Sequence, residues 1–419
     1  MAPVFPLRPG AKGAVVTRRY RFDCVECSED HRAFAELLGD AYSRRVRPLC
    51  LCRDPGVEMY IADVGEQLVV KRMPLTGGRH DPACPSYELP YDLSGLGPLL
   101  GSAIKLDGAD GLASLKLDFA LTKRAATARA ATASLGAKSV KIKGKKLSLR
   151  ALLHFLWHES GLTEWTANWS GRRHWWQVYH HLVDAAGHMT VRGEALSECL
   201  LIPEPFKTED KLAIEERRSY KLRRLFQPSA GSGRLMILVG EVKDFAGARN
   251  GRQIVIRHMP GFRLHLEEET WKNVQRRFEP ELKLWQSGET SHLMMIATIA
   301  SGDAGILTVN EIALMSVSEQ WLPIESAYER QLVERLARLR TKSVKGLRFD
   351  LSRGQPFANA TLPEMKPQPV ALYIVPPSAD EAFEAGIKEM LVARPDLSAW
   401  IWRVADGEMP SLPLQNNSV

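Results

Sequence analysis

The sequence predicts an α+β fold of several modules, and three observations support this class. Strand-like and helix-like segments occur in separate blocks along the chain, which is typical of α+β proteins. The 419 residues correspond to about two to four domains at roughly 150 residues each. Of these residues, 45% are hydrophobic and 25% are charged. That composition can form buried cores and excludes a wholly disordered chain.

The first module, residues 1–122, is predicted to be a β module. Two runs rich in Val, Ile and Tyr, at 57–62 and 67–73, are separated by the turn-like sequence DVGE, and together they predict a β-hairpin. A short helix is expected at 31–42, and one or two more strands at 108–124. The hairpin matters because it would bring the segments at its two ends together.

Those two ends carry a pattern of metal-ligating residues. Cys50 and Cys52 are one residue apart before the hairpin, and His80 and Cys84 are four apart after it. Zinc takes four nitrogen or sulfur ligands, usually as two close pairs that the fold brings together. We therefore expect a structural zinc site, filled by four protein ligands, that stabilises this module.

Two alternatives qualify this prediction. The thiols could be buried apolar residues beside a surface histidine, although reduced thiols in a cytoplasmic protein favour metal binding over disulfides. Cys24 and Cys27 form a separate pair with the spacing Cys-x-x-Cys, and only Cys199 remains outside both groups. The role of Cys24 and Cys27 stays open.

A basic linker is predicted at residues 123–150, where the sequence carries nine Lys or Arg residues and no acid. It is poor in large apolar residues, so we interpret it as an exposed boundary segment. Cations of this kind bind phosphates without regard to sequence. The candidate phosphate contacts here are Lys141, Lys143, Lys145 and Lys146.

A helical region follows at residues 151–230. Helices are predicted at 148–162, with Ser148 as N-cap, at 170–187 and at 209–226, because each segment carries apolar residues at helical spacing. Arg172 and Arg173 precede two tryptophans in this region and are candidate phosphate contacts. Tryptophans at helical spacing usually belong to the core, and we expect this of Trp157 and Trp176.

A central α/β region is predicted at residues 231–325. Strands are expected at 234–245, 252–259, 291–300 and 308–324, and a helix at 267–285. In the first of these strands, Glu241 and Lys243 are two residues apart and should lie on one face. A carboxylate that binds Mg²⁺ beside a lysine that orients water is the core of many nucleases, but a second acid is required.

The last region, residues 326–419, should contain a helix at 326–340, short strands at 346–351 and 370–376, a helix at 378–394 and a closing strand at 399–405. This order resembles the restriction-endonuclease-like layout, with Glu329 on the first helix. In that family the acid and the Glu-x-Lys motif lie on the strands. The comparable strand here reads VALYIVP, so the resemblance implies a degenerate copy that binds and does not cut.

Several stretches spread along the chain carry a resemblance to a known family: CLCRDPGVEMYIA, VKRMPLTGGRHDPAC, GEVKDF, EQWLPIESAYE, GLRFDL and AWIWRV followed by MPSLPL. Through them, and over nearly its full length, the chain resembles an uncharacterised bacterial family, the domain of unknown function 1173. The resemblance implies a setting on plasmids and integrative elements but no established activity. It also implies that Cys50, Cys52 and Cys84 are the N-terminal cysteines of the family.

Together these features predict a nucleic-acid-binding accessory protein of a bacterial mobile element, with DNA as the favoured partner. The net charge of +7 is compatible with an anionic partner. The alternatives are a Mg²⁺-dependent nuclease that uses Glu241 and Lys243, or a protein–protein scaffold in a transfer or replication complex. No apolar run reaches the roughly 18 residues of a spanning helix, so we expect a cytoplasmic protein without a membrane partner.

Overall fold

The structure is a computed structural model that describes residues 17–64, 67–82, 84–88, 90–106, 111–124, 146–226, 232–288, 290–302 and 305–413. The chain divides into two compact units, Met1–Leu89 and Pro90–Val419. The predicted helical, central and C-terminal regions therefore belong to one unit, together with residues 90–122. Both units combine helices and sheets, which confirms the α+β class. Within the described ranges, no helix is long and apolar enough to cross a membrane.

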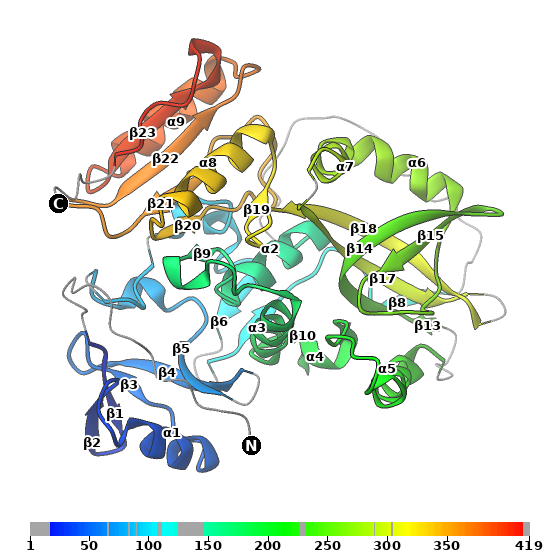
Figure 1. Cartoon of the computed structure of the whole chain (residues 1–419), viewed down its shortest axis with the longest axis horizontal. Coiled ribbons are helices and arrows are strands. Elements are labelled where there is room, and N and C mark those ends of the chain that lie inside the picture. The colour runs from blue at the N-terminus through cyan, green and yellow to red at the C-terminus, as the bar shows by residue number, and fades with distance from the viewer. Residues whose placement is uncertain are drawn as a thin grey trace. The chain divides into compact units, whose positions relative to one another are not determined.

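The N-terminal unit is a five-stranded antiparallel sheet with one helix, α1 (Phe34–Ser43). Its strands are β1 (Arg19–Phe22), β2 (Val25–Ser28), β3 (Leu49–Cys50), β4 (Val57–Asp63) and β5 (Leu68–Arg72), in the order β2-β1-β3-β4-β5 (Figure 1). The predicted hairpin is confirmed, because β4 and β5 pair from Met59 opposite Arg72 to Asp63 opposite Leu68. Buried Tyr20 and Met59 lie in the core beneath this sheet.

The C-terminal unit begins with a small mixed sheet in the order β11-β10-β7-β6. Its strands are β6 (Ile104–Leu106), β7 (Ala113–Leu115), β10 (Met189–Val191) and β11 (Glu194–Ala195). A separate pair joins β8 (Thr122–Arg124) to β13 (Ser232–Arg234). Helices alternate with these strands along the chain: α2 (Leu149–Glu159) and α3 (Trp175–Gly187) precede β10, and α4 (Leu196–Cys199) and α5 (Lys211–Phe226) follow β11.

The three helices predicted for this region are confirmed as α2, α3 and α5, but one prediction about side-chain burial is wrong. Ser148 caps α2 by accepting a hydrogen bond from the Ala151 N–H, and Trp157 is fully buried. The prediction that Trp176 belongs to the core is wrong: it is 39% exposed, whereas Trp175 is buried. The buried face of α3 is the helical stripe that contains Trp175, Val178 and Leu182, and a residue one position from this stripe turns away from it.

A closed five-stranded barrel forms the middle of the C-terminal unit and is drawn in green to yellow in Figure 1. Its ring runs β14-β15-β16-β18-β17 and returns to β14, because β14 pairs with both β15 and β17. The barrel strands are β14 (Met236–Ala248), β15 (Gly251–Ile256), β16 (Leu264–Leu266), β17 (His292–Ser301) and β18 (Leu307–Val317). Two short strands extend it, β12 (Leu200–Leu201) beside β14 and β19 (Pro323–Ile324) beside β18.

Two helices, α6 (Glu268–Arg277) and α7 (Glu279–Gln286), lie between β16 and β17 in the chain. The sequence predicts one helix here, and the structure breaks it at Phe278. Pro280 stands in the first turn of α7, where its missing N–H costs nothing, whereas inside a continuous helix it would remove a hydrogen bond. Trp271 on α6 packs against Phe245 of β14 at a ring distance of 4.7 Å.

The C-terminal part of this unit is a sheet in the order β23-β22-β21-β20-β9. Its elements are β9 (Glu164–Trp165), α8 (Ala327–Arg338), β20 (Ser343–Lys345), β21 (Ala360–Leu362), β22 (Val370–Val375), α9 (Glu381–Ala393) and β23 (Ser398–Arg403). The strands β22 and β23 are parallel and are joined through α9. The predicted strand at 346–351 is wrong. This segment is a loop in which Phe349 takes a left-handed backbone conformation, with φ of 49°, that does not fit a strand.

Candidate functional site

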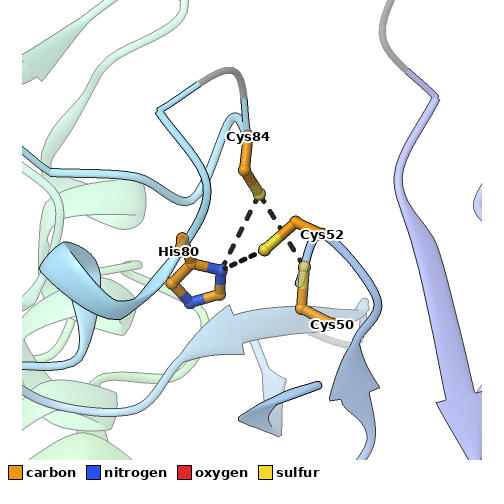
Figure 2. A group of neighbouring side chains, drawn as sticks. All are labelled: Cys50, Cys52, His80 and Cys84. Atoms are coloured by element: carbon orange, nitrogen blue, oxygen red, sulfur yellow. Dashed lines mark hydrogen bonds between the residues drawn. The ribbon is translucent and has the colours of Figure 1, made fainter. Parts of the chain in front are cut away.

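Four side chains from the two ends of the β4–β5 hairpin meet in the N-terminal unit (Figure 2). Cys50 ends β3 and Cys52 lies in the turn after it, while His80 and Cys84 belong to the segment after β5. One ligand atom from each residue lies within 4.8 Å of the others. Within the described ranges, this is the one cluster of three or more His, Cys, Asp or Glu residues with such geometry.

The distances suit a tetrahedral zinc ion. Zinc–sulfur bonds of about 2.3 Å and zinc–nitrogen bonds of about 2.0–2.1 Å give tetrahedral edges of roughly 3.8 Å between two sulfurs and 3.6 Å between sulfur and nitrogen. The sulfurs of Cys50 and Cys84 are 3.7 Å apart. The Nδ1 atom of His80 lies 3.3 Å from the Cys52 sulfur and 3.7 Å from the Cys84 sulfur.

Backbone N–H groups contact two sulfurs of the cluster. The N–H of Asp81 donates to the Cys52 sulfur and the N–H of Ser86 donates to the Cys84 sulfur, each at 3.4 Å. The hydrogen bond with Cys50 lowers the pKa of Cys84 to about 3, and the contacts with His80 and Ser86 act in the same direction. The same hydrogen bond raises the pKa of Cys50, and burial raises that of Cys52, so without a metal the negative charge belongs to Cys84. Thiolates are the form that binds metal, so the donor set fits zinc.

A glycine and a buried ion pair shape the turn that presents His80. Gly77 begins a 3₁₀ turn, and the N–H of His80 donates to its carbonyl at 3.2 Å. A Cβ atom on Gly77 would lie 2.5 Å from the Cβ atom of Glu88, so a larger residue does not fit here. Glu88 is buried and pairs with Arg72 of β5, which ties this turn to the hairpin.

The remaining cysteines do not join the cluster. Cys24 is exposed, and Cys27 is buried with its thiol donating to the carbonyl of Ser28 at 3.4 Å. Cys199 lies in the other unit, where its thiol donates to the carbonyl of Leu196. None of the three has the partners that a second metal site would need among the described residues.

The predicted phosphate contacts differ in their placement. Lys141, Lys143 and Lys145 lie outside the described residues, and Lys146 is exposed. Arg172 is also exposed. Arg173, in contrast, is buried.

The buried guanidinium of Arg173 is occupied by the protein itself. It donates to the backbone carbonyls of Leu162, Glu164 and Gln320 at 2.6–3.3 Å. It also lies 4.8 Å from the ring centre of Trp169. Arg173 thus joins three chain segments and is not offered to a phosphate.

Glu241 and Lys243 are separated by an irregularity in β14. The pairing of β14 with β15 shifts between Val242 and Asp244, so the alternation of faces breaks at Lys243. Lys243 is exposed, whereas Glu241 is buried, accepts a hydrogen bond from His292 Nδ1 at 2.8 Å and forms an ion pair with Arg257 at 2.7 Å. Glu241 therefore has cationic and imidazole partners, and no second acid joins it in a metal-sized group within the described ranges.

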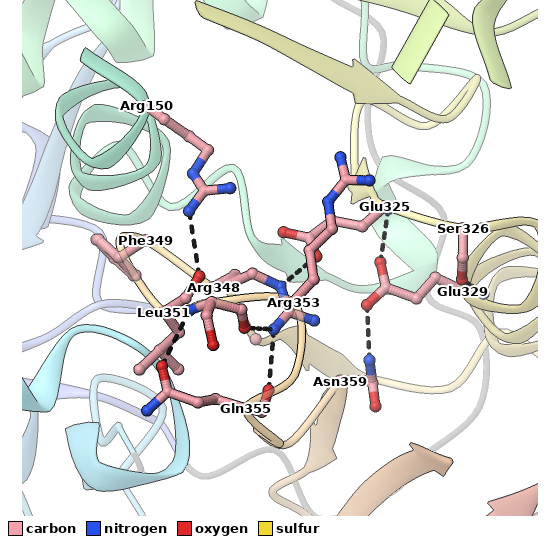
Figure 3. A network of polar contacts seen from close by, with 12 residues as sticks. Arg150, Glu325, Ser326, Glu329, Arg348, Phe349, Leu351, Arg353, Gln355 and Asn359 are labelled. Carbon is pink, nitrogen blue, oxygen red and sulfur yellow. Dashed lines mark hydrogen bonds and ion pairs between the residues drawn. The ribbon is translucent and has the colours of Figure 1, made fainter. Parts of the chain in front are cut away.

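A buried polar network occupies the loop that follows β20 (Figure 3). Arg348 pairs with Glu325 at 2.6 Å and donates to the carbonyls of Ser352 and Gln355. Glu329 on α8 accepts from Lys345 at 3.2 Å and from Asn359 at 2.6 Å. Buried charges are tolerated when they are paired in this way, so the network is structural: it fixes the loop against α8.

Sequence reasoning missed two pockets on the barrel that share His258 and Met259. The "loop pocket", of about 490 Å³, is lined mainly by residues 256–263, which connect β15 to β16. The "helix pocket", of about 690 Å³, lies between this connection and α5. The sequence RHMPGFR at 257–263 held the signal, because a Pro-Gly turn between two strands that carries two arginines marks a basic loop.

Comparisons with known proteins give one match. The family model described as "Protein of unknown function (DUF1173)" matches residues 20–405. No curated protein and no solved structure was found to match the chain. The matched region contains the Cys/His cluster, the barrel and the C-terminal sheet.

Proposed function

Because the chain belongs to the DUF1173 family, whose function is unknown, we propose a function from its geometry: it is a nucleic-acid-binding accessory protein, with DNA as the favoured partner. We place it on a bacterial mobile element, a plasmid or an integrative element, where other proteins of the element would be further partners. Its N-terminal unit would carry a structural zinc ion. The binding surface would lie in the C-terminal unit.

The closed five-stranded barrel carries this proposal. The OB-fold is a five-stranded Greek-key barrel that binds oligonucleotides on its outer face, and the ring here likewise has five strands, of which β16 and β18 form a parallel pair. A fold analogy alone does not assign a function. The additional support is the charge of the loop pocket, which is lined by Lys243, Arg257 and Arg263 and by no acid.

The zinc ion would act on stability and not on chemistry. All four tetrahedral positions would be filled by Cys50, Cys52, His80 and Cys84, which leaves no position for water. Three thiolates give the site a negative charge even with the cation bound, so it does not attract phosphate itself. Its contribution is to hold the N-terminal sheet together.

The C-terminal sheet favours binding over cleavage. The order α8, β20, β21, β22, α9, β23, with β22 and β23 parallel, resembles the restriction-endonuclease-like layout. The strand β22 carries neither an acid nor a lysine, and the carboxylate of Glu329 is taken by Lys345 and Asn359. This part would therefore serve as a degenerate copy without a metal site of its own.

Fluorescence anisotropy tests the proposal directly. The full-length, zinc-loaded protein is titrated into labelled single-stranded DNA, duplex DNA and single-stranded RNA at about 50 and 200 mM salt. We expect binding of at least one of these at low salt, and a loss of affinity of about tenfold or more at the higher salt. Absence of binding at low salt, or binding that ignores salt, would overturn the proposal.

The two alternative functions predict other results. A Mg²⁺-dependent nuclease would cleave the labelled DNA when Mg²⁺ is added, and Glu241→Gln would abolish the cleavage. A protein–protein scaffold would retain a protein partner at high salt and no nucleic acid. For the nuclease, the ion pair of Glu241 with Arg257 would first have to open, because it occupies the carboxylate.

A further inference from the structure

We propose that the ligand is a single strand, and that it lies along the loop pocket and the helix pocket, which together form a "barrel groove". This inference rests on the proposed function. It adds where the nucleic acid binds and that the nucleic acid is single-stranded. Three features carry it: exposed cations at the loop pocket, an exposed tyrosine and a partly buried phenylalanine beside arginines, and the continuity of the two pockets.

The cations of the loop pocket are available to a ligand. Lys243 and Arg263 are exposed and make no hydrogen bond or ion pair within the described part of the chain. Arg257 pairs with Glu241, but 52% of its side chain is exposed, so part of its guanidinium faces solvent. A run of cations that lacks acids is the electrostatic footprint of a phosphate backbone.

The bulge in β14 contributes to this footprint. The pairing of β14 with β15 passes from Val242 opposite Ile256 to Asp244 opposite Val255, so Lys243 is the extra residue of the bulge. The extra residue leaves Lys243 at the rim of the loop pocket, next to Gln253 and Val255 on β15. Bulges re-aim side chains at functional sites in this way.

Aromatic rings lie beside arginines in both pockets. Phe262 lines the loop pocket and has the guanidinium of Arg218 at 5.7 Å from its ring centre. Tyr220 lines the helix pocket, is 70% exposed and has Arg223 at 5.5 Å. Rings of this kind can stack on nucleic acid bases while the arginines contact phosphates.

The two pockets form one path. Both are lined by His258 and Met259, and the contact between Arg218 on α5 and Phe262 in the loop joins their walls. The helix pocket is also lined by three acids, Glu198, Glu204 and Glu216. Most arginines of α5 have acidic partners: Arg217 pairs with Glu204, Arg218 with Glu215 and Arg224 with Glu194. Arg223 is exposed and has no acidic partner among the described residues. Its charge is therefore available to a ligand, as are those of Lys243 and Arg263 in the loop pocket.

Stacking favours a single strand over a duplex. In a duplex each base stacks on its neighbours and its face is not accessible, whereas in a single strand the faces are exposed. Tyr220 and Phe262 therefore have a use in single-strand binding that they lack on duplex DNA. The ligand class is a single strand of DNA or RNA, since both share the phosphates and base faces that the barrel groove would contact.

The test compares two charge-removal variants of the full-length, zinc-loaded protein. Lys243→Gln/Arg263→Gln removes two groove cations, and Arg338→Gln/Lys388→Gln removes two exposed cations from α8 and α9 as a matched control. The probe is labelled oligothymidylate or oligouridylate of about 20 nucleotides. We expect the groove variant to weaken single-strand binding by about tenfold, and to reduce the slope of log K against log salt by about 1.4. The control should change neither.

A third variant separates stacking from charge. Tyr220→Ser keeps the net charge and removes a ring that is 70% exposed and does not belong to the core. We expect an affinity loss of about tenfold for the single strand, with an unchanged salt slope. The stronger of the oligothymidylate and oligouridylate probes then identifies DNA or RNA as the source of the strand.

Other outcomes would overturn the inference. Tighter binding of a duplex than of either single strand would remove the single-strand assignment. Salt-sensitive single-strand binding that neither groove variant alters would remove the site while leaving the proposed function intact. Failure of the wild-type protein to bind any nucleic acid would overturn both.

Discussion

In the N-terminal unit three of the nine buried residues in the main core are cysteines, whereas the C-terminal unit encloses a barrel of fully buried aliphatic side chains such as Ile237, Val239 and Ile296. A small unit buries a smaller share of its surface and gains less from the hydrophobic effect. The two units therefore differ in what surrounds their cores: a Cys/His cluster that could hold a metal where the core is small, and extensive apolar burial where it is large.

The larger unit can also carry buried charges. Glu329 and Lys345 are 4% and 3% exposed at their side chains and pair with each other. Taking both charges out of water is costly, and a large apolar core supplies the stability that tolerates this cost. The N-terminal unit also has a buried pair, Arg72 with Glu88, but that pair lies next to the metal ligands and supports their turn.

The largest effect is expected when a ligand is removed from the Cys/His cluster of the N-terminal unit. Cys52→Ser should lower the zinc content from about one ion per chain to well below half, and the N-terminal unit should lose its folded structure. Structural zinc supplies about 10–16 kcal/mol in small zinc-binding peptides, more than a typical domain's stability. Elemental analysis of the purified protein, with limited proteolysis of the N-terminal unit, measures both effects.

The matched control for this experiment is Cys24→Ser, because Cys24 is exposed and lies outside the cluster. It should keep the zinc and the protease resistance of the wild type. A Cys52→Ser protein with a full zinc ion would disprove the four-ligand site. Cys50→Ser should behave as Cys52→Ser does.

A smaller effect is expected from the buried ion pair in the C-terminal unit. Glu329→Ala leaves Lys345 buried without its carboxylate and should lower the free energy of unfolding by about 3–5 kcal/mol. Tryptophan fluorescence in urea measures this unit alone, because all ten tryptophans of the chain lie between residues 157 and 402.

Its control is Glu364→Ala, which removes the partner of Lys342 at an exposed site. An exposed pair contributes about 0–1 kcal/mol, so the control should unfold close to the wild type. Equal losses in the two variants would contradict the view that burial sets the cost.

The smallest effect is a pH dependence in the same unit. Burial lowers the pKa of His154 to about 3, and the charge of Arg150 acts in the same direction. In the unfolded chain the pKa is about 6.5, so below this value the unfolded state binds a proton that the folded state does not. His154 therefore contributes full stability above pH 6.5 and loses about 2 kcal/mol between pH 6.5 and 5.

The variant His154→Gln tests this dependence. Its side-chain oxygen can accept the Phe349 N–H, which His154 Nδ1 accepts at 2.9 Å in the wild type. Urea unfolding followed by tryptophan fluorescence at pH 7 and pH 5 should show a smaller loss of stability in the variant than in the wild type. An identical loss in both proteins would show that other groups cause the pH dependence.

Local features were predictable from the sequence, and non-local ones were not. The hairpin, the Cys/His cluster and the Ser148 cap follow from strand alternation, ligand spacing and N-cap preference, which all act within short segments. The closed barrel depends on the pairing of β14 with β17, which starts at Met236 opposite Ile299, and no local pattern signals this pairing. The burial of Arg173 likewise depends on Gln320, far along the chain.

Single-residue shifts account for two further differences. Lys243 lies at a bulge, so the alternation that the sequence suggests for Glu241 and Lys243 is interrupted. Trp175 and Trp176 are adjacent, and helical spacing could not decide which of them is buried until the stripe with Val178 and Leu182 was known. A pattern of period two or 3.6 is sensitive to such one-residue changes.

The short strand β9 has a consequence for how this protein can be divided. Its Ser343 and Val344 partners on β20 lie about 180 positions along the chain from Trp165 and Glu164. A ribosome must therefore finish most of the second unit before this sheet edge is covered, and such distant pairings form late. A truncation at residue 230 or 325 would leave open strand edges that can pair with other chains. Fragments for expression should accordingly keep residues 90–413 in one piece.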